Sequence, residues 1–218
     1  MKIPLFIPYI NRPDMLERVC RMAVCPNVEI NILDNSDGPS IMFSGIPLIY
    51  RRPTVPLSFT QTQNWMLKIT QADADYGPFY MWVHCDALLE PDSVERLYVR
   101  AMEECDKGTK WGVIYTHYDI LSACNVEAME TVGGYDTLFF DYASDCDYYR
   151  RLDLAGYARL ESGIKVGHDQ GSQTIRSDPA QNRRVGIQVD YRGRLYRAMW
   201  GGDPGREMFA TKWGGRIG

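Results

Sequence analysis

The feature that most constrains the fold is an alternation of apolar strands and amphipathic helices along the first half of the chain. Residues 3–9 form a short β-rich run, a helical pattern begins at Pro13, and a second strand over 28–33 ends at Asp34-Asn35. We expect the alternation to continue with strands over 46–50 and 79–83 and helices over 61–71 and 91–105. This order predicts an α/β fold with a mostly parallel sheet flanked by helices.

The second half of the chain has a less regular pattern. We expect paired strands over 111–116 and 118–124, helices over 126–132 and 144–154, and a strand over 164–167 followed by His168. Beyond His168 the periodicity fades into a segment rich in Gly and Trp. We therefore predict a domain over residues 1–168 and an irregular arm over 169–218 packed on that domain.

Composition is that of an ordinary globular protein, with 218 residues, 45% hydrophobic and 24% charged. The apolar run at the start is short and broken by proline, unlike a signal peptide or a membrane span, so we expect a cytoplasmic protein. Six cysteines occur without a C-x-x-C pair, which argues against a zinc ribbon or a dense disulfide framework. We expect reduced thiols.

The net charge of -4 is unevenly distributed. From residue 170 onward nine basic residues face four acidic ones, so this arm carries 9 - 4 = +5 and the rest of the chain -9. The basic residues are Arg176, Arg183, Arg184, Arg192, Arg194, Arg197, Arg206, Lys212 and Arg216. Such an arm is consistent with phosphate contacts on a nucleic acid, and equally with a solvated surface.

Polar residues follow three of the predicted strands, at 9–12, 34–37 and 84–86. In a parallel sheet, ligands bind at the carboxyl ends of the strands, so we expect these clusters to converge on one edge. Asp86 comes directly after a buried strand, where a hard oxygen ligand can hold a divalent cation against a diphosphate. Taken alone, an aspartate in that position is more often a turn or helix cap.

Several short motifs match those of one known family. Residues 144–151, S-D-C-D-Y-Y-R-R, match E-D-x-D-x-x-x-R with Ser144 in place of the glutamate, and residues 133–140, G-G-Y-D-T-L-F-F, resemble G-G-F-D-x-x-F-F with Tyr135 in place of the first phenylalanine. Residues 8–12 match P-x-x-N-R, Asp34 and Asn35 resemble the D-N/D-x-S element, and residues 84–86, H-C-D, are a variant of D-x-D. The chain resembles the inverting, family-2-like GT-A glycosyltransferases of the small stand-alone bacterial and phage type, whose endings are also similar to the W-G-G-D-P-G-R-E-M-F run over 200–209.

The resemblance implies a role for each matching residue. Asp145 is the expected catalytic base, which deprotonates the acceptor hydroxyl on the face opposite the leaving diphosphate, so that the sugar centre inverts. Asp86 and His168 are the expected ligands of Mn²⁺ or Mg²⁺. His84 is a third candidate for the metal or the nucleotide. The expected nucleotide contacts are Pro8, Asn11, Arg12, Asp34 and Asn64, and the expected sugar and acceptor contacts are Gly133, Gly134, Asp147 and Arg151.

Each motif also has an ordinary structural interpretation. Asp34-Asn35 readily forms an Asx turn, and His168 alone would more often be a hydrogen-bonded structural histidine. Asp145 and Asp147 can stabilise a helix N-terminus, and Arg151 is a natural i,i+4 partner of Asp147.

The activity that the resemblance implies is transfer of a sugar from a nucleotide-diphosphate sugar, with uridine diphosphate favoured, to a hydroxyl acceptor. The acceptor is a glycan or other polymer, or a hydroxymethylated pyrimidine in phage DNA contacted by the basic arm. The departures at His84 and Ser144 leave open a non-catalytic nucleotide-sugar-binding protein. A sugar-phosphate nucleotidyltransferase fits less well, because residues 8–12 lack the glycine-rich phosphate loop of that class.

Overall fold

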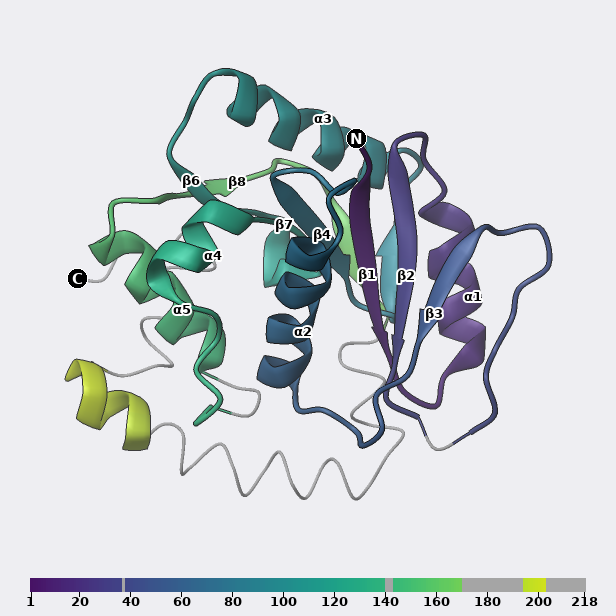
Figure 1. Ribbon diagram of the computed structural model, residues 1–218, viewed down its shortest axis with the longest axis horizontal. Coiled ribbons are helices and arrows are strands. Elements are labelled where there is room, and N and C mark those ends of the chain that lie inside the picture. The colour runs from purple at the N-terminus through teal and green to yellow at the C-terminus, as the bar shows by residue number, and fades with distance from the viewer. Residues whose placement is uncertain (37, 140–142, 170–193, 203–218) are drawn as a thin grey trace.

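The computed structural model describes residues 1–36, 38–139, 143–169 and 194–202, and the structural statements below concern these residues (Figure 1). A seven-stranded sheet has the order β3-β2-β1-β4-β7-β6-β8, and a second sheet pairs β5 with β9. The strands are β1 (Ile3–Tyr9), β2 (Val28–Asp34), β3 (Leu48–Arg51), β4 (Phe79–Val83), β5 (Ala87–Leu89), β6 (Trp111–Tyr115), β7 (Leu121–Asn125), β8 (Ala158–Glu161) and β9 (Val166–His168). The helices are α1 (Pro13–Met22), α2 (Phe59–Ala72), α3 (Ser93–Asp106), η1 (His117–Asp119), α4 (Val126–Val132) and α5 (Ser144–Leu154). A further helix covers residues 194–200.

The predicted α/β alternation is confirmed, and so is the mostly parallel sheet. β7 alone among the seven strands runs antiparallel to its neighbours β4 and β6. Two short strands were not predicted, β5 and β8, because three or four residues are too few for a readable alternation. α3 begins at Ser93 rather than at residue 91, because Asp92 has a left-handed backbone with φ of 62°.

Two expectations about the end of the domain were wrong in detail. His168 is the last residue of β9 rather than a residue after the strand, and it pairs with Ala87 of β5. The prediction of an irregular arm fails over residues 194–200, which are helical. Tyr196 of this helix is 1% exposed and packs its ring 6.5 Å from that of Phe139. The remaining residues of the predicted arm, 170–193 and 203–218, lie outside the described residues.

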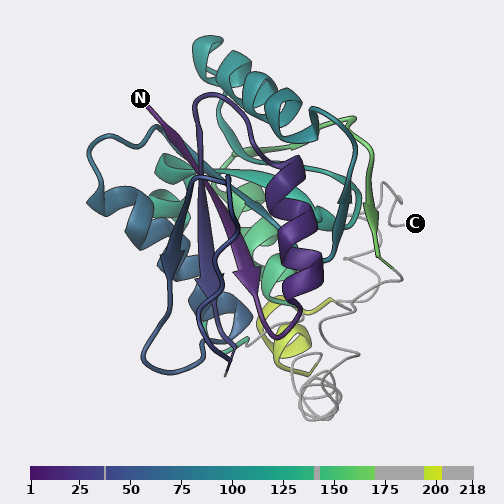
Figure 2. The same ribbon diagram turned by 90° about the vertical axis from the view of Figure 1, so that its right-hand side faces the viewer.

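Helices cover both faces of the sheet (Figure 2). One core layer joins the sheet to α1 and α3 through residues such as Leu16 and Leu97, which are both 0% exposed. The other joins it to α2, α4 and α5 through Met66, Met129 and Tyr148. Each fully buried side chain of this size contributes about 1.5–3 kcal/mol of burial free energy, so the helices are fixed firmly on the strands.

Register brings the carboxyl ends of the central strands together. β1 pairs with β2 in parallel from Ile3↔Val28 to Tyr9↔Asp34, and β4 lies on the other side of β1 with Phe6↔Trp82. The segments that follow β1, β2 and β4 therefore share one edge of the sheet, as expected. This is the edge that carries the candidate site.

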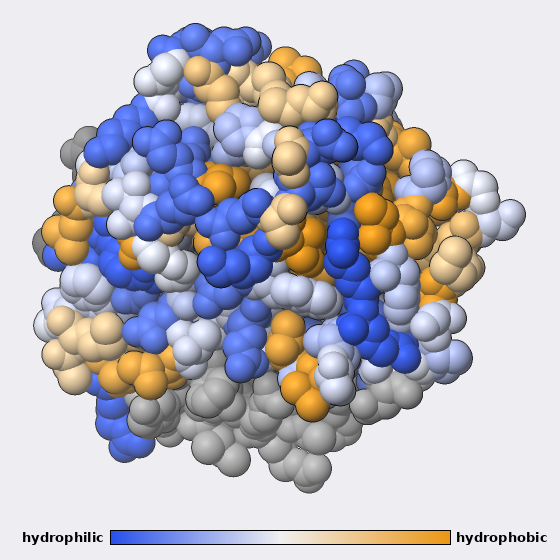
Figure 3. All heavy atoms as spheres, viewed as in Figure 1, coloured by the Kyte–Doolittle hydropathy of each residue, from blue (hydrophilic) through white to orange (hydrophobic). Residues whose placement is uncertain are grey.

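The surface and the thiols are unremarkable in kind. On the face seen in Figure 3, hydrophobic side chains are scattered among hydrophilic ones, as on most protein surfaces. All six cysteines lie within the described residues and carry thiols that form no disulfide, as predicted. Among the described residues, no helix combines the length and the apolar character that crossing a bilayer requires.

Candidate functional site

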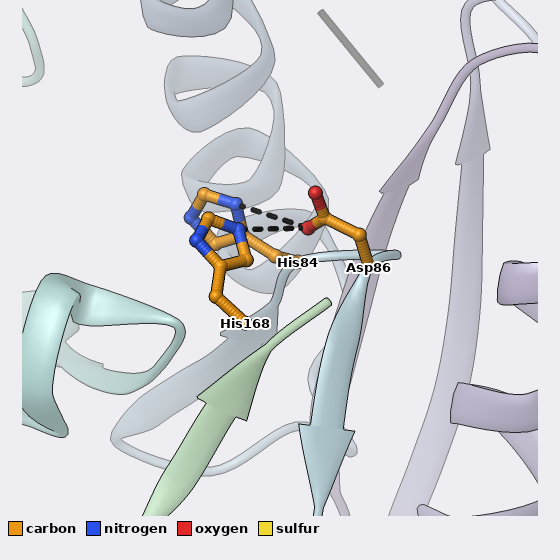
Figure 4. A group of neighbouring side chains, drawn as sticks. All are labelled: His84, Asp86 and His168. Atoms are coloured by element: carbon orange, nitrogen blue, oxygen red, sulfur yellow. Dashed lines mark hydrogen bonds and ion pairs between the residues drawn. The ribbon is translucent and has the colours of Figure 1, made fainter. Parts of the chain in front are cut away.

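Three side chains converge at the carboxyl end of β4 (Figure 4). β4 is buried throughout, and just beyond it the His84 amide donates to the Ile120 carbonyl at 2.9 Å, which holds the strand exit against β7. Asp86 follows in the turn that leads into β5. Because β5 pairs with β9 through Ala87↔His168, His168 is brought beside Asp86, which lies 82 positions earlier in the chain.

The geometry of this cluster suits a divalent cation. His168 Nε2 lies 3.0 Å from Asp86 Oδ1, and His84 Nδ1 lies 3.8 Å from the same oxygen. The candidate ligand atoms of all three residues lie within 4.8 Å of one another. Adjacent ligands of an octahedral ion, each about 2.1 Å from the metal, are about 3.0 Å apart, so the donor set and its spacing fit Mg²⁺ or Mn²⁺.

Burial strengthens the case for a cation at Asp86. The residue is 2% exposed, and a carboxylate at that depth is costly unless positive charge or hydrogen bonds compensate it. The two imidazoles are more open, with side chains 33% exposed for His84 and 21% for His168. The three predicted metal ligands are thus assembled in one place, with one side of the cluster accessible.

Asp34 anchors a second polar cluster at the end of β2. Its side chain is 0% exposed and accepts hydrogen bonds from the Ser36 amide at 2.8 Å, the Ser36 hydroxyl, the Tyr50 hydroxyl and the Arg52 guanidinium. Sequence reasoning predicted Asp34 but missed Tyr50 and Arg52. Both lie at or just beyond the end of β3, which runs parallel to β2, so the strand pattern itself was the signal that could have found them.

Tyr9 lies between these two clusters in electrostatic terms. Burial raises its pKa to about 12, and the negative charges of Asp34 and of the Cys85 thiolate reinforce the shift. Asp34, in one cluster, and Cys85, in the loop of the other, therefore both lie near the Tyr9 side chain. Tyr9 was not among the predicted site residues.

The other residues predicted on the nucleotide side are arranged around the end of β1. Pro8 pairs with Leu33 in the sheet, and Asn11 has a left-handed backbone with φ of 52°. Arg12 donates to both carboxylate oxygens of Asp14 at 3.0 and 2.8 Å, and this pairing lowers the pKa of Asp14. They share the edge with Asp34, and their contact with a nucleotide stays a prediction.

Asn64 holds a turn through its side chain. It projects from α2 and binds the Tyr135 backbone twice, donating to the carbonyl at 2.8 Å and accepting from the amide at 2.7 Å. A Cβ on Gly134 would lie 2.2 Å from Asn64 Oδ1, so the second glycine of the Gly133-Gly134 pair is required for this close approach. The Asn64 amide therefore holds the turn at Tyr135 on α2, and its contact with a nucleotide stays a prediction.

The acidic residues of α5 differ in their surroundings. Asp147 is 1% exposed and pairs with Arg151 at 2.8 Å, the predicted i,i+4 contact. Arg151 also donates to the carbonyls of Val132 and Gly133 at 2.7 and 3.1 Å, which ties α5 to the end of α4. Asp145 lies in the first turn of α5, is half-buried, and accepts from the Cys146 amide at 2.7 Å.

Two further contacts on α5 were not predicted, one of them buried and the other partly buried. The Tyr149 hydroxyl donates to Asp119 at 2.6 Å, which connects the helix to the turn that precedes β7. The Trp200 indole donates to Asp147 Oδ1 at 3.0 Å, so the helix over residues 194–200 is docked on the same region. Both contacts span long sequence separations, and no local pattern in the sequence marks them.

A groove of about 760 Å³ opens beside β5 and β9. Its lining includes Glu90, His117, Glu161 and Lys165, together with residues of β5 and β9. None of the predicted site residues lines it. We therefore place the candidate site at the cluster of His84, Asp86 and His168, called the cation cluster below. The donor atoms and spacing of this cluster define its chemistry better than the lining of the open groove does.

Comparison with known proteins supports the fold assignment. No protein-family profile matches the chain, and no curated protein sequence matches it. Among solved structures, glucosyl-3-phosphoglycerate synthase from Mycobacterium tuberculosis is 15% identical with a TM-score of 0.53, covering 86% of this chain and 79% of that chain. The same enzyme with Mn²⁺, uridine-diphosphate-glucose and glycerol 3-phosphate is 14% identical, with a TM-score of 0.52 and coverage of 86% and 78%.

A third structure of that synthase, with uridine diphosphate, is 14% identical with a TM-score of 0.51 and coverage of 80% and 74%. These likenesses, together with the mostly parallel sheet, show that the chain has a GT-A-like α/β fold similar to that of this synthase. At these identities the comparison concerns the fold.

Proposed function

We propose that the protein is a metal-dependent glycosyltransferase that moves a sugar from a nucleotide-diphosphate sugar to a hydroxyl acceptor. The observation that carries the proposal is the His84–Asp86–His168 cluster at the carboxyl end of β4, on a fold similar to that of enzymes of this class. Uridine diphosphate is the favoured donor nucleotide, since the similar synthase binds uridine-diphosphate-glucose with Mn²⁺. This synthase is the guide for the donor, not for the sugar or the acceptor.

In the proposed site, Asp86 and His168 hold Mn²⁺ or Mg²⁺, with His84 as a third ligand. A cation bound there would supply positive charge against the negative charge that develops on the departing diphosphate. The base of the donor binds at the Asp34 cluster, where the Arg52 side chain is 33% exposed and has donors to offer. Tyr9, Asn11 and Arg12 lie between the two clusters along the same strand edge.

Asp145 is the proposed catalytic base. A half-buried carboxylate in the first turn of a helix is stabilised as the anion by the helix dipole and remains accessible to an acceptor hydroxyl. In a single displacement, the hydroxyl proton moves to this carboxylate while the acceptor oxygen bonds to the anomeric carbon and the bond to the diphosphate breaks. Attack opposite the leaving group inverts the anomeric centre.

The acceptor is proposed as a class. A hydroxyl of a glycan or other polymer is the broader choice, and a hydroxymethylated pyrimidine in DNA is the narrower one. Of the nine basic residues behind the DNA proposal, Arg194 and Arg197 are described, and the other seven lie outside the described residues. Steep loss of DNA affinity with added salt is the expected outcome for a DNA acceptor, and a flat response removes it.

We also propose that the protein works in a reducing compartment such as the cytoplasm. The six cysteine thiols support this, because reduced thiols persist where glutathione and thioredoxin systems operate.

Donor turnover tests the proposed function. Release of uridine diphosphate from uridine-diphosphate-glucose and related donors is measured with Mn²⁺, with chelator, and with candidate acceptors. Asp145→Asn is expected to lower turnover by about 10²–10⁴-fold while retaining nucleotide binding. Asp153→Asn is the matched control, since Asp153 is an acid on the same helix that pairs with Arg159 at 2.8 Å. Binding of uridine diphosphate without turnover of any donor contradicts catalysis and favours the non-catalytic binding protein.

A further inference from the structure

One ion pair outside the cation cluster connects it to α1. Asp169 directly follows His168, and its amide donates to the Asp86 carbonyl at 3.0 Å. Its carboxylate accepts from Arg18 Nη1 at 2.7 Å. The pair joins residues 151 positions apart, and none of the site motifs includes either of them.

Arg18 is part of a well-anchored helix. α1 is fixed in the core by its neighbours Leu16 and Val19, which are 0% and 1% exposed, and it contacts β5. The Nε and Nη2 atoms of Arg18 are buried and meet no acceptor within the described ranges of the chain. Asp169 is therefore where this guanidinium is engaged, and the pair is a defined attachment point.

β9 needs such an attachment. The β5–β9 pair has three register positions, from Leu89↔Val166 to Ala87↔His168, and His168 occupies the last of them. A two-stranded sheet of this length is marginal on its own, and the hydrogen bond from the Asp169 amide to the Asp86 carbonyl extends it by one residue beyond His168, so this end of the pair depends on how Asp169 is held. A metal ligand on a fraying strand would bind weakly, because ordering it opposes binding.

We propose that the Arg18–Asp169 ion pair is a positioning element that holds β9 against α1 and keeps His168 oriented towards Asp86 for a divalent cation. The inference rests on the proposed function, since it concerns the same metal site. Neither residue touches the cation in this account. Their effect passes through the orientation of His168, and outer groups that orient metal ligands typically change affinity by about 10–100-fold when removed.

The test is a titration of the full-length protein with Mn²⁺ alone, following free Mn²⁺ by electron paramagnetic resonance. Arg18→Met and Arg18→Gln remove the ion pair, and Arg18→Lys preserves the charge. Arg21→Met is the matched control, since Arg21 lies on the same helix and pairs with Glu17 in an exposed i,i+4 contact at 2.6 Å. Asp86→Asn defines the signal that belongs to the site.

A purely electrostatic effect and a positioning effect predict opposite changes in Mn²⁺ affinity for Arg18→Met. Removing a nearby positive charge should tighten the binding of a cation if electrostatics alone acts. Loss of positioning should weaken it, and we expect about tenfold weaker Mn²⁺ binding in Arg18→Met and Arg18→Gln, partial recovery in Arg18→Lys, and no change in Arg21→Met. Two substitutions at Arg18 keep the test informative if one of them does not fold.

The outcomes separate the inference from the function it rests on. Wild-type binding that is lost in Asp86→Asn, with unchanged or tighter binding in both neutral Arg18 variants, overturns the positioning role and leaves the metal site standing. Wild-type protein that shows no Asp86-dependent Mn²⁺ binding overturns the metal site, and the positioning role falls with it.

Discussion

Replacing Asn64 by alanine should destabilise the fold by an amount that the structure allows us to work out. The Asn64 amide makes two hydrogen bonds with the Tyr135 backbone, at 2.8 and 2.7 Å, from a half-buried position. Each such bond contributes about 0.5–1.5 kcal/mol net, and backbone groups left without a partner add to the loss. We expect Asn64→Ala to lower the free energy of unfolding by about 2–3 kcal/mol. In a domain of this size that lowers Tm by about 5–10 °C.

The assay is urea unfolding followed by circular dichroism, with Lys68→Ala as the control. Lys68 is exposed on the same helix, so its replacement should change stability by less than about 0.5 kcal/mol. Gly134→Ala sharpens the test, because its Cβ would lie 2.2 Å from Asn64 Oδ1. Its cost should shrink in the Asn64→Ala background, where that atom is gone.

The affinity of the Asn64→Ala variant for uridine diphosphate is measured on the same material, because the family resemblance predicts a nucleotide contact at this residue. Unchanged stability in Asn64→Ala, or additive effects of Asn64→Ala and Gly134→Ala, would show that the contacts between Asn64 and the Tyr135 backbone do not stabilise the fold.

Three further predictions concern other parts of the molecule. Burial raises the pKa of Cys20 and Cys124 to about 12 and that of Cys25 to about 11, so thiol labelling at pH 8 should be slow and should accelerate with rising pH. Labelling should begin at the half-buried Cys25 and Cys105 and reach the other thiols only on unfolding. Fast labelling of Cys20 in the native protein would contradict this. Burial acts to raise the pKa of Glu29, but hydrogen bonds from Lys2 and Tyr76 outweigh it, and the pKa lies below 4.5. The stabilisation from this ionised carboxylate is therefore present above pH 4.5 and is lost as the pH falls through the lower pKa of the folded state. Glu29→Gln should flatten the acid limb of the stability–pH profile, and an unaltered limb argues against the pairing. Trp200→Phe removes one hydrogen bond to the buried Asp147 and should cost about 1.5–3 kcal/mol in urea unfolding, whereas wild-type stability in this variant means the contact is absent in solution.

The sequence was sufficient to predict the layered fold because its strands and helices are locally consistent. β1 and β4 are apolar runs of seven and five residues, the seven residues of β2 largely alternate apolar and polar side chains, and polar residues follow each strand. Once parallel order is inferred, the convergence of Asp34 and Asp86 on one edge follows from general sheet geometry. The short strands β5 and β8 could not be predicted, since their pairing depends on partners distant in the sequence.

The candidate metal site was predictable in its members, while its supports were not. Asp86, His84 and His168 could be nominated from residue type and context. Their supporting contacts could not, because Arg18 and Asp169 are 151 positions apart and pair only through the tertiary structure. The same holds for Asn64, whose amide binds the Tyr135 backbone 71 residues away.

The most direct test of the account is the position of Mn²⁺ in crystals grown with Mn²⁺ and uridine diphosphate, located by its anomalous scattering. We expect one strong peak within about 2.0–2.3 Å of Asp86 and His168, adjoining the diphosphate, with the base beside Asp34. A peak that avoids Asp86 and His168, or a nucleotide bound away from this edge of the sheet, would contradict the proposed metal and nucleotide site.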